Sequence, residues 1–259
     1  MKRSALILIA WVCWAQFAPA AVVERIVEYQ AGDVVCEGFH AYDDADAGKR
    51  PAVLIVHQWT GLSEYEKRRA RMLVELGYNV FALDIYGKGV RPPGPPASAQ
   101  EAGKYKNNRA LFRERLRAGL EVLLNDERTD PAKVAAIGYC FGGTGVLELA
   151  RSGAQVAGVV SFHGGLDSPN PADGKNIQCE VLVLHGQDDP FVPAADIAAF
   201  EQELQQAQVS YHLVRYPGAV HAFTQPMAGD DPAKGAAYHE QADKASWEEM
   251  RKFFDRIFR

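Results

Sequence analysis

The sequence predicts a doubly wound α/β fold, in which helices cover both faces of a mostly parallel sheet. Six short apolar runs alternate with amphipathic stretches from Pro51 onward. Four of the runs are nearly continuous in Val, Ile, Leu and Ala, which is typical of parallel strands buried on both faces. Such alternation implies right-handed crossovers and helices on both sides of the sheet. Ligands of these sheets bind at the carboxyl ends of the strands, so the residues that follow each run are the candidates for chemistry.

The strands are expected in chain order, beginning with a hairpin. "RIVEYQ" and "VVCEGFHAYD" are separated by the turn composition "AGD", which predicts an antiparallel hairpin at one edge of the sheet. The strands of the main sheet are expected at "AVLIVH", "NVFALDIY", "KVAAIGYC", "VAGVVSFH", "EVLVLHG" and "SYHLVRYPG". Residues 87–100, "GKGVRPPGPPASAQ", contain four prolines and three glycines. We expect no regular structure there, but a loop that forms one wall of the site.

Three helical segments are predicted from spacing and charge. One helix is expected to begin near Pro193, which suits a first helical turn. Its apolar face would carry Ile197, Phe200 and Leu204. A stronger stripe predicts a final helix that packs on the core, with Trp247, Met250, Phe254 and Ile257. The run "KRRAR", residues 67–71, is expected to be the solvated face of a helix.

Composition and charge limit the class of protein. The 259 residues are 47% hydrophobic and 24% charged, as in a soluble globular protein. Residues 1–20 combine Lys2 and Arg3, a short apolar run and the small residues "APA", which predicts a secretory signal peptide and a single domain over residues 21–259. The run is shorter than the roughly 20 residues of a membrane span, although an uncleaved anchor is the alternative. We therefore expect a secreted or periplasmic protein with no membrane span after cleavage.

The remaining chain has 26 basic and 33 acidic residues, which argues against nucleic-acid binding. It keeps three cysteines, Cys36, Cys140 and Cys179. An odd number leaves at least one free thiol in an oxidising compartment. We expect Cys140 to be that thiol, and Cys36 and Cys179 to be buried and free, with a disulfide between them as the alternative.

The stretch "GYCFGG" predicts a nucleophile at a sharp turn between a strand and a helix. Gly138 and Gly142 frame Cys140 in the pattern G-x-nucleophile-x-G, and Gly143 extends it. The start of the following helix favours a thiolate, and the Phe141 amide is placed to stabilise an oxyanion. The alternative is a buried structural cysteine.

An acid and a histidine are expected after this turn, in that order. "VLVLHGQDDPFVP" supplies Asp188 and Asp189 at a strand end, and "VRYPGAVHAF" supplies His221 at the next. His221 would take the thiol proton, and an aspartate would orient the imidazole. The other histidines at strand ends, His57, His163 and His185, are expected to be structural. No His, Cys and Asp group has the spacing of a zinc site, so we expect no metal.

The loop "VHQWTG" after the first buried strand is the expected source of a second oxyanion donor, the backbone amide of Trp59. Several aromatic residues near the same edge are candidates for lining a substrate pocket. They are Trp59, Tyr86, Phe141, Phe191 and Phe223.

Taken together, "GYCFGG", "HGQDDPFVP", "YPGAVHAF" and "VHQWTGLSEYEKRRARMLVELGYNVFALDIYG" resemble the dienelactone hydrolase family of α/β-hydrolases. The resemblance covers roughly Val22 to Arg259. It implies an α/β-hydrolase fold and a Cys-His-Asp triad that hydrolyses esters or lactones without a cofactor. These roles fall on Cys140, His221 and Asp189, because the family pattern D-x-x-V-P begins at Asp189 rather than Asp188.

Three positions depart from the family pattern. A glutamate often follows the first buried strand, where it can contact the cysteine, and here the residue is Gln58. The family uses two arginines to hold the carboxylate of dienelactone, and the matching positions here are Lys88 and Gln225, which offer no bidentate fork. We therefore expect a hydrolase that cleaves a small ester or lactone through a thioester, but not dienelactone itself. The alternatives are a thioesterase or peptidase, or a non-catalytic binding or redox-thiol protein.

Overall fold

The computed structural model describes residues 22–45 and 48–259, so the predicted signal peptide lies outside the described residues. The described strands form an eight-stranded sheet in the order β1-β2-β4-β3-β5-β6-β7-β8. Their bounds are β1 (Val22–Ala31), β2 (Val34–Asp43), β3 (Arg50–Val56), β4 (Asn79–Ala82), β5 (Thr129–Tyr139), β6 (Gly158–Phe162), β7 (Glu180–Gly186) and β8 (Tyr211–Tyr216). From β4 to β8 all neighbours are parallel, which confirms the predicted mostly parallel sheet.

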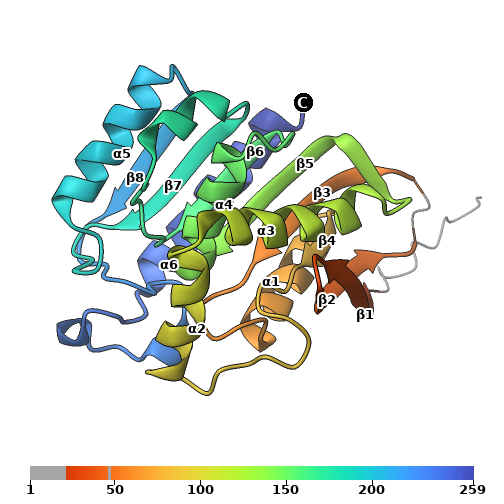
Figure 1. Cartoon of the computed structure of the whole chain (residues 1–259), viewed down its shortest axis with the longest axis horizontal. Helices are drawn as coiled ribbons and strands as arrows, with labels where there is room; N and C mark the ends of the chain where they lie inside the picture. The colour runs from red at the N-terminus through yellow and green to blue at the C-terminus, as the bar shows by residue number, and fades with distance from the viewer. Residues whose placement is uncertain (1–21, 46–47) are drawn as a thin grey trace, which may run out of the picture.

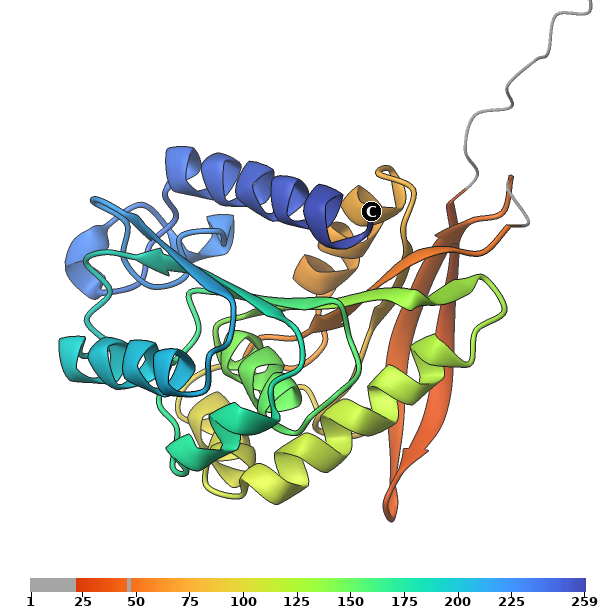
Figure 2. The same ribbon diagram turned by 90° about the horizontal axis from the view of Figure 1, so that it is seen from above.

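Helices cover both faces of the sheet, as predicted (Figure 1). They are α1 (Glu64–Val74), α2 (Ala97–Lys106), α3 (Arg109–Leu124), α4 (Phe141–Arg151), α5 (Ala194–Gln206) and α6 (Glu240–Ile257), with short 3-10 helices η1 (Pro171–Asn176), η2 (Pro226–Ala228) and η3 (Pro232–Lys234). Figure 2 shows α1 and α6 on one side of the sheet and α3, α4 and α5 on the other. Two buried apolar clusters fill the two interfaces.

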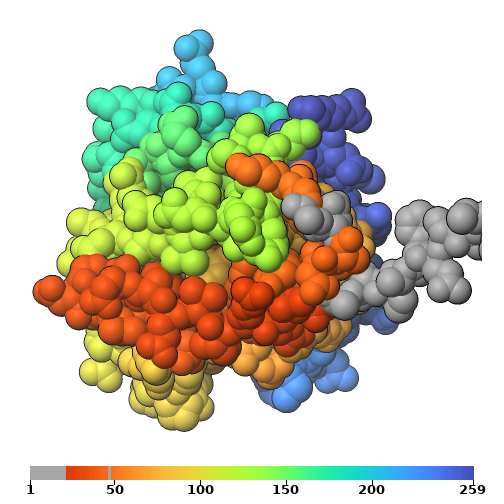
Figure 3. Space-filling view, turned by 90° about the vertical axis from the view of Figure 1, so that its right-hand side faces the viewer, coloured from red at the N-terminus to blue at the C-terminus, as the bar shows by residue number. Residues whose placement is uncertain are grey.

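The N-terminal hairpin lies at one edge of the sheet, which confirms its prediction. β1 pairs antiparallel with β2, and β2 pairs antiparallel with β4. The two strands run as a red and orange band across that side of the molecule (Figure 3). They therefore cover the edge of β4, which would otherwise expose unpaired backbone groups.

The path of the chain reverses beside β5. From β3 the chain moves to β4 on one side, and from β5 it moves through β6 and β7 to β8 on the other. In open α/β sheets a ligand binds at such a switch point, outside the carboxyl ends of the strands. Cys140 directly follows β5 and lies at this point.

Two details differ from the sequence predictions. Regular structure begins before Gln100, because α2 starts at Ala97. The prolines all precede the helix, where they do not remove any of its hydrogen bonds. The run at residues 67–71 does lie on a helix, but Arg69 is only 3% exposed and its guanidinium lies 2.6 Å from Asp243 of α6. The packing of α6 against α1 buries the Arg69 guanidinium, and the sequence did not reveal this contact.

Cys36, Cys140 and Cys179 are free, and Cys36 and Cys179 are buried, as expected. Burial raises the pKa of the Cys36 thiol to about 11 and that of Cys179 to about 12, so neither is a reactive thiolate at neutral pH. In the part of the chain that the structure describes, no helix has the length and apolarity needed to cross a lipid bilayer.

Candidate active site

The turn between β5 and α4 presents Cys140 above the end of the sheet. The residue has φ of 55° and ψ of −116°, a conformation that non-glycine residues rarely adopt. Glycines allow the surrounding backbone to approach closely. A Cβ atom at Gly138 would overlap the carbonyl oxygen of Gly142, and one at Gly142 would overlap that of Val56. The glycine frame in the sequence is therefore required by the turn.

Three side chains from separate strand ends form one hydrogen-bonded row. The Sγ atom of Cys140 lies 3.0 Å from Nε2 of His221. The Nδ1 atom of the same imidazole lies 2.8 Å from Oδ2 of Asp189. Such a row can move a proton from the thiol to the imidazole while the carboxylate holds the ring.

The two adjacent aspartates have different surroundings. The Asp189 carboxylate is buried, and its Oδ1 atom accepts a hydrogen bond of 2.8 Å from the Phe191 amide. Asp188 is exposed, and its carboxylate accepts the Gly218 amide at 3.0 Å. The structure therefore brings Asp189, and not Asp188, to His221.

The electrostatics of the row favour a thiolate and an imidazolium. Burial raises the pKa of the Cys140 thiol, but the charge and hydrogen bond of His221 and the Phe141 amide outweigh burial and lower it below its ordinary value. Burial lowers the pKa of His221, but the Cys140 thiolate and Asp189 raise it well above the usual range of a histidine. Each partner stabilises the charged form of the other.

The loop after β3 orients the peptide bond between Gln58 and Trp59. The Gln58 carbonyl accepts hydrogen bonds from Nδ1 of His57, at 2.6 Å, and from the Gly61 amide, at 3.1 Å. The Nε2 atom of His57 accepts the Ile85 amide, so the ring proton must be on Nδ1. Because a trans peptide is planar, the Trp59 N–H points away from these donors. This N–H donates to no other residue in the described part of the chain.

The carboxylate of Glu66 also supports this loop, although sequence reasoning did not single it out. Glu66 is fully buried and accepts the Gln58 amide at 3.1 Å and the Ser63 amide at 2.9 Å. Its bond with Ser63 is half of a capping box at the start of α1. This S-x-x-E pattern was the signal in the sequence that could have identified Glu66.

A cavity of about 670 Å³ opens onto Cys140 and His221. Five further predicted residues line it, namely Gln58, Trp59, Phe141, Phe191 and Gln225. Most of the remaining lining residues are small or apolar, and they include Ala99, Val192, Ala222, Met227 and Ala228.

Three predicted pocket residues lie elsewhere. Lys88 is exposed, and its ammonium lies 2.5 Å from the Glu28 carboxylate of β1. Tyr86 is buried beneath the Trp59 loop and donates a hydrogen bond of 2.9 Å to the Trp59 carbonyl. Phe223 is fully buried, with its ring edge against His163. They follow strands that end at the correct edge of the sheet, but their side chains are not among those that line the cavity.

Helix α2 supplies a wall of the cavity, where the sequence predicted a loop over residues 87–100; of that segment only Ala99, which lies in α2, is among the lining residues. Ala99, Ala102, Gly103 and Lys106 line the cavity and share one helix face, because they are spaced by three or four residues. Beyond the Cys140–His221 pair, Lys106 is the one charged side chain among the described lining residues, and its positive charge also lowers the pKa of Cys140. The helical spacing was present in the sequence, but the neighbouring prolines masked it.

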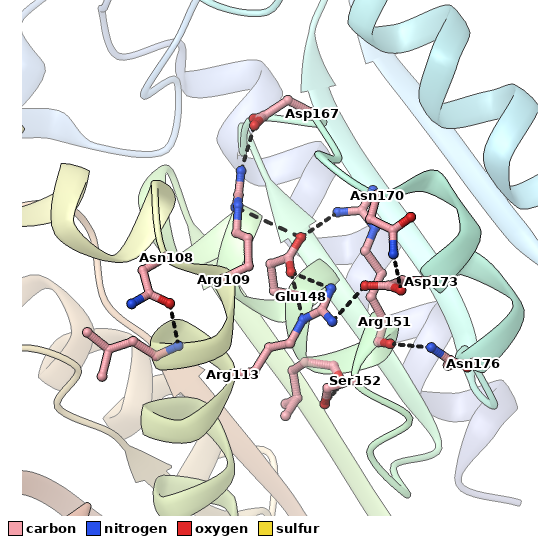
Figure 4. Close-up of polar contacts among 12 residues, drawn as sticks. Asn108, Arg109, Arg113, Glu148, Arg151, Ser152, Asp167, Asn170, Asp173 and Asn176 are labelled. Carbon is pink, nitrogen blue, oxygen red and sulfur yellow. Dashed lines mark hydrogen bonds and ion pairs between the residues drawn. The ribbon is translucent and has the colours of Figure 1, made fainter. Parts of the chain in front are cut away.

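An ionic network anchors the last turn of α4 (Figure 4). Cys140 precedes the first turn of this helix, so the network lies at the opposite end. Glu148 is fully buried and accepts hydrogen bonds from Arg113 of α3, at 2.9 Å, and from Arg151, at 3.1 Å. Arg113 also pairs with Asp173 of η1 at 2.7 Å. The network fixes the helix whose first turn faces the thiol.

Solved structures of high similarity share this fold. The protein m3DLH is 36% identical, with a TM-score of 0.89 over 92% of this chain and 100% of its own. P91, a dienelactone hydrolase-like promiscuous phosphotriesterase from metagenomic libraries, is 38% identical, with a TM-score of 0.88 and the same coverage.

A curated relative from Synechocystis, a putative carboxymethylenebutenolidase, is 26% identical over 80% of this chain and 86% of its own length. The model of the dienelactone hydrolase family matches residues 36–258, which include the turn at Cys140 and both strand ends that supply Asp189 and His221. The chain therefore belongs to the dienelactone hydrolase family.

Proposed function

We propose that this protein hydrolyses a carboxylic ester or lactone, with the Cys140 thiolate as nucleophile. The observation that carries the proposal is the hydrogen-bonded row from Cys140 Sγ through His221 to Asp189. The thiolate attacks the carbonyl carbon, and the oxygen becomes an anion that accepts hydrogen bonds from the Trp59 and Phe141 amides. The His221 imidazolium then gives its proton to the leaving alkoxide, which departs as an alcohol or, in a lactone, stays attached.

A thioester between the acyl group and Cys140 remains. Neutral His221 takes a proton from water, and the hydroxide adds to the thioester carbonyl. When this second tetrahedral intermediate collapses, the carboxylic acid leaves and the thiolate–imidazolium pair forms again. Asp189 keeps the imidazole proton on Nδ1 in the neutral state, so that Nε2 can accept a proton.

Names of relatives and the lining of the cavity support this substrate class. A Bradyrhizobium relative, 27% identical over 77% of this chain, is a probable 2-oxo-3-(5-oxofuran-2-ylidene)propanoate lactonase. The cavity is mainly apolar, with Lys106 as its one ammonium group among the described residues. This composition supports an ester or lactone whose bulk is apolar and which carries at most one anionic group.

The experiment is to trap the acyl-enzyme. The protein is mixed with an aryl ester and quenched in acid, and its intact mass and peptides are measured. We expect one acyl group on Cys140, turnover of the ester, and loss of both in Cys140→Ala. Cys179→Ala is the matched control, because that thiol is buried and distant in sequence. Retained hydrolysis in Cys140→Ala would refute the proposal, and labelling without turnover would favour a non-catalytic thiol.

A substrate panel then separates the remaining alternatives. It contains lactones, aryl esters, thioesters and peptide amides that share one acyl group. We expect higher kcat/KM for esters and lactones than for thioesters or amides, and the opposite order would indicate a thioesterase or a peptidase. An aryl phosphotriester is included because P91 is described as a promiscuous phosphotriesterase.

We also propose that the protein is exported from the cytoplasm. The proposal is supported by the basic start, short apolar run and small residues in positions 1–20. N-terminal sequencing of the protein from the periplasmic or culture fraction should begin at Ala21. Recovery of the full-length chain in the cytoplasmic fraction alone would contradict export.

A further inference from the structure

We propose that His163 is a positioning residue that fixes the relative placement of Cys140 and His221 for the proposed hydrolysis, so this inference rests on the proposed function. His163 directly follows β6, the strand between the one that ends at Cys140 and the one that leads to Asp189. It is fully buried, and it does not line the cavity. It therefore acts through other residues and not on the substrate.

One ring nitrogen of His163 holds the backbone of the nucleophile. The Cys140 amide donates to Nδ1 of His163 at 3.1 Å and to the Phe162 carbonyl at 3.0 Å. Because Nδ1 accepts an amide proton, the ring proton is on Nε2. This assigns the tautomer from the hydrogen-bond partners alone.

The other ring nitrogen holds the loop that carries the base. The Nε2 proton is donated to Oγ1 of Thr224, at 2.8 Å, and Thr224 lies three residues after His221. The ring of His163 also meets the ring of His221 edge-on, with 5.3 Å between centroids. One imidazole thus contacts both partners of the proposed proton transfer.

Thr224 is itself fixed from the other side. Its hydroxyl lies 2.6 Å from the Tyr65 hydroxyl of α1, and its carbonyl accepts a hydrogen bond of 3.0 Å from Arg69. Arg69 pairs with Asp243 of α6 at 2.6 Å. The buried arginine of the "KRRAR" run therefore has a role in this network, which extends from α6 to the Cys140 amide.

The local backbone supports a specific requirement for this residue. His163 has φ of 40°, in the left-handed region that is unfavourable for most side chains. An apolar residue would be strained at this φ as well, and it would offer no acceptor to the Cys140 amide. Such strain persists near sites where the surrounding contacts require it.

The role requires a neutral imidazole, and its surroundings maintain that state. Burial lowers the pKa of His163 well below its usual range, and the positive charges of His221 and Arg69 lower it further. The other titratable groups that face the ring are Tyr139 of β5, Tyr65 of α1, across Thr224, and His185 of β7. The ring nitrogen therefore stays an acceptor while His221 carries the proton.

Two substitutions separate the two bonds. In His163→Asn, the amide oxygen occupies the place of Nδ1 and can accept the Cys140 amide, and asparagine tolerates a positive φ. In His163→Gln, the amide nitrogen reaches the place of Nε2 and can donate to Thr224, but no acceptor remains at Nδ1. We expect kcat of His163→Gln to fall about 3- to 10-fold, because the Cys140 amide keeps the Phe162 carbonyl but loses its second acceptor, and that of His163→Asn to fall less than about twofold. KM should be unchanged in both.

The second readout needs no substrate. The rate of Cys140 alkylation by iodoacetamide reports the thiolate fraction, and its pH midpoint should rise in His163→Gln because the pairing with His221 loosens. Thr224→Val should also raise the pH midpoint of alkylation. Thr224→Ser keeps the hydroxyl, so its midpoint should equal that of the wild type. If the His163 variants do not fold, these two Thr224 variants test whether the bond between His163 and Thr224 positions the base.

Equal midpoints and equal kcat in His163→Asn, His163→Gln and the wild type would overturn the proposal. A lower melting temperature without any change in alkylation would also overturn it, because it would assign His163 a purely structural role. If Cys140→Ala still hydrolyses esters, the proposed function fails, whereas the alkylation midpoints still measure the positioning of the thiol.

Discussion

Replacement of Asp189 by asparagine tests the proposed mechanism most directly. In the wild type, Oδ1 accepts the Phe191 amide at 2.8 Å and Oδ2 faces Nδ1 of His221 at 2.8 Å. In Asp189→Asn the Phe191 amide keeps the carbonyl oxygen on its own side, so the NH₂ group faces His221. Nδ1 must then accept, the ring proton moves to Nε2, and Nε2 can no longer take a proton from Cys140.

Two magnitudes bracket the loss in this variant. A buried hydrogen bond to a charged group contributes about 1.5–3 kcal/mol, or roughly 10- to 150-fold in rate. A histidine held in the wrong tautomer reduces kcat by about 10⁴-fold in a comparable triad. We therefore expect kcat for an aryl ester to fall on the order of 10³- to 10⁴-fold, with melting temperature measured alongside.

The neighbouring carboxylate provides the matched control. Asp188 is exposed and accepts only the Gly218 amide among the hydrogen bonds of the described residues, so Asp188→Asn should change kcat by less than about threefold. The reasoning is refuted if Asp189→Asn keeps more than about a tenth of the wild-type kcat, or if Asp188→Asn is the more damaging change.

Three further predictions concern the surroundings of the thiol and the support of α4. Gln58→Glu places a negative charge in the cavity, so the pKa of Cys140 should rise and its alkylation at neutral pH should slow by up to about tenfold; an unchanged pH midpoint would place residue 58 away from the sulfur. Lys106→Met removes a charge that lowers the pKa of Cys140, so alkylation should slow a few-fold, whereas Lys106→Arg should leave it unchanged; equal rates in both would contradict this. Glu148→Gln removes the charge that Glu148 shares with the half-buried Arg113 and the buried Arg151, and it should lower the free energy of unfolding by about 3–5 kcal/mol in urea titration; a loss below about 1 kcal/mol would contradict it.

The sequence by itself determined the features that depend on neighbouring residues. Periodicity of apolar residues predicted the strands and helices, because each element must bury one face or both. The glycines around Cys140 predicted the sharp turn, because the backbone there cannot accommodate Cβ atoms. The order of Cys140, Asp189 and His221 along the chain, each after a strand, predicted that they meet, because parallel strands end at one edge.

Only the tertiary structure decided which side chains reach the cavity. Asp188 and Asp189 are adjacent in sequence, and the turn after β7 directs one carboxylate to His221 and the other to solvent. Lys88 was expected at the pocket, but Lys106 lines it, because α2 folds over the cavity from a segment rich in proline.

The buried network behind the site could not be read from the sequence either. His163, Thr224, Arg69 and Asp243 come from four separate segments, and only the packing of β6, α1 and α6 brings them together. The direction of a side chain, and the partner that satisfies it once it is buried, depend on contacts between residues far apart in the chain. The sequence thus determined that a nucleophile lies at this edge, and the tertiary contacts decided how it is held.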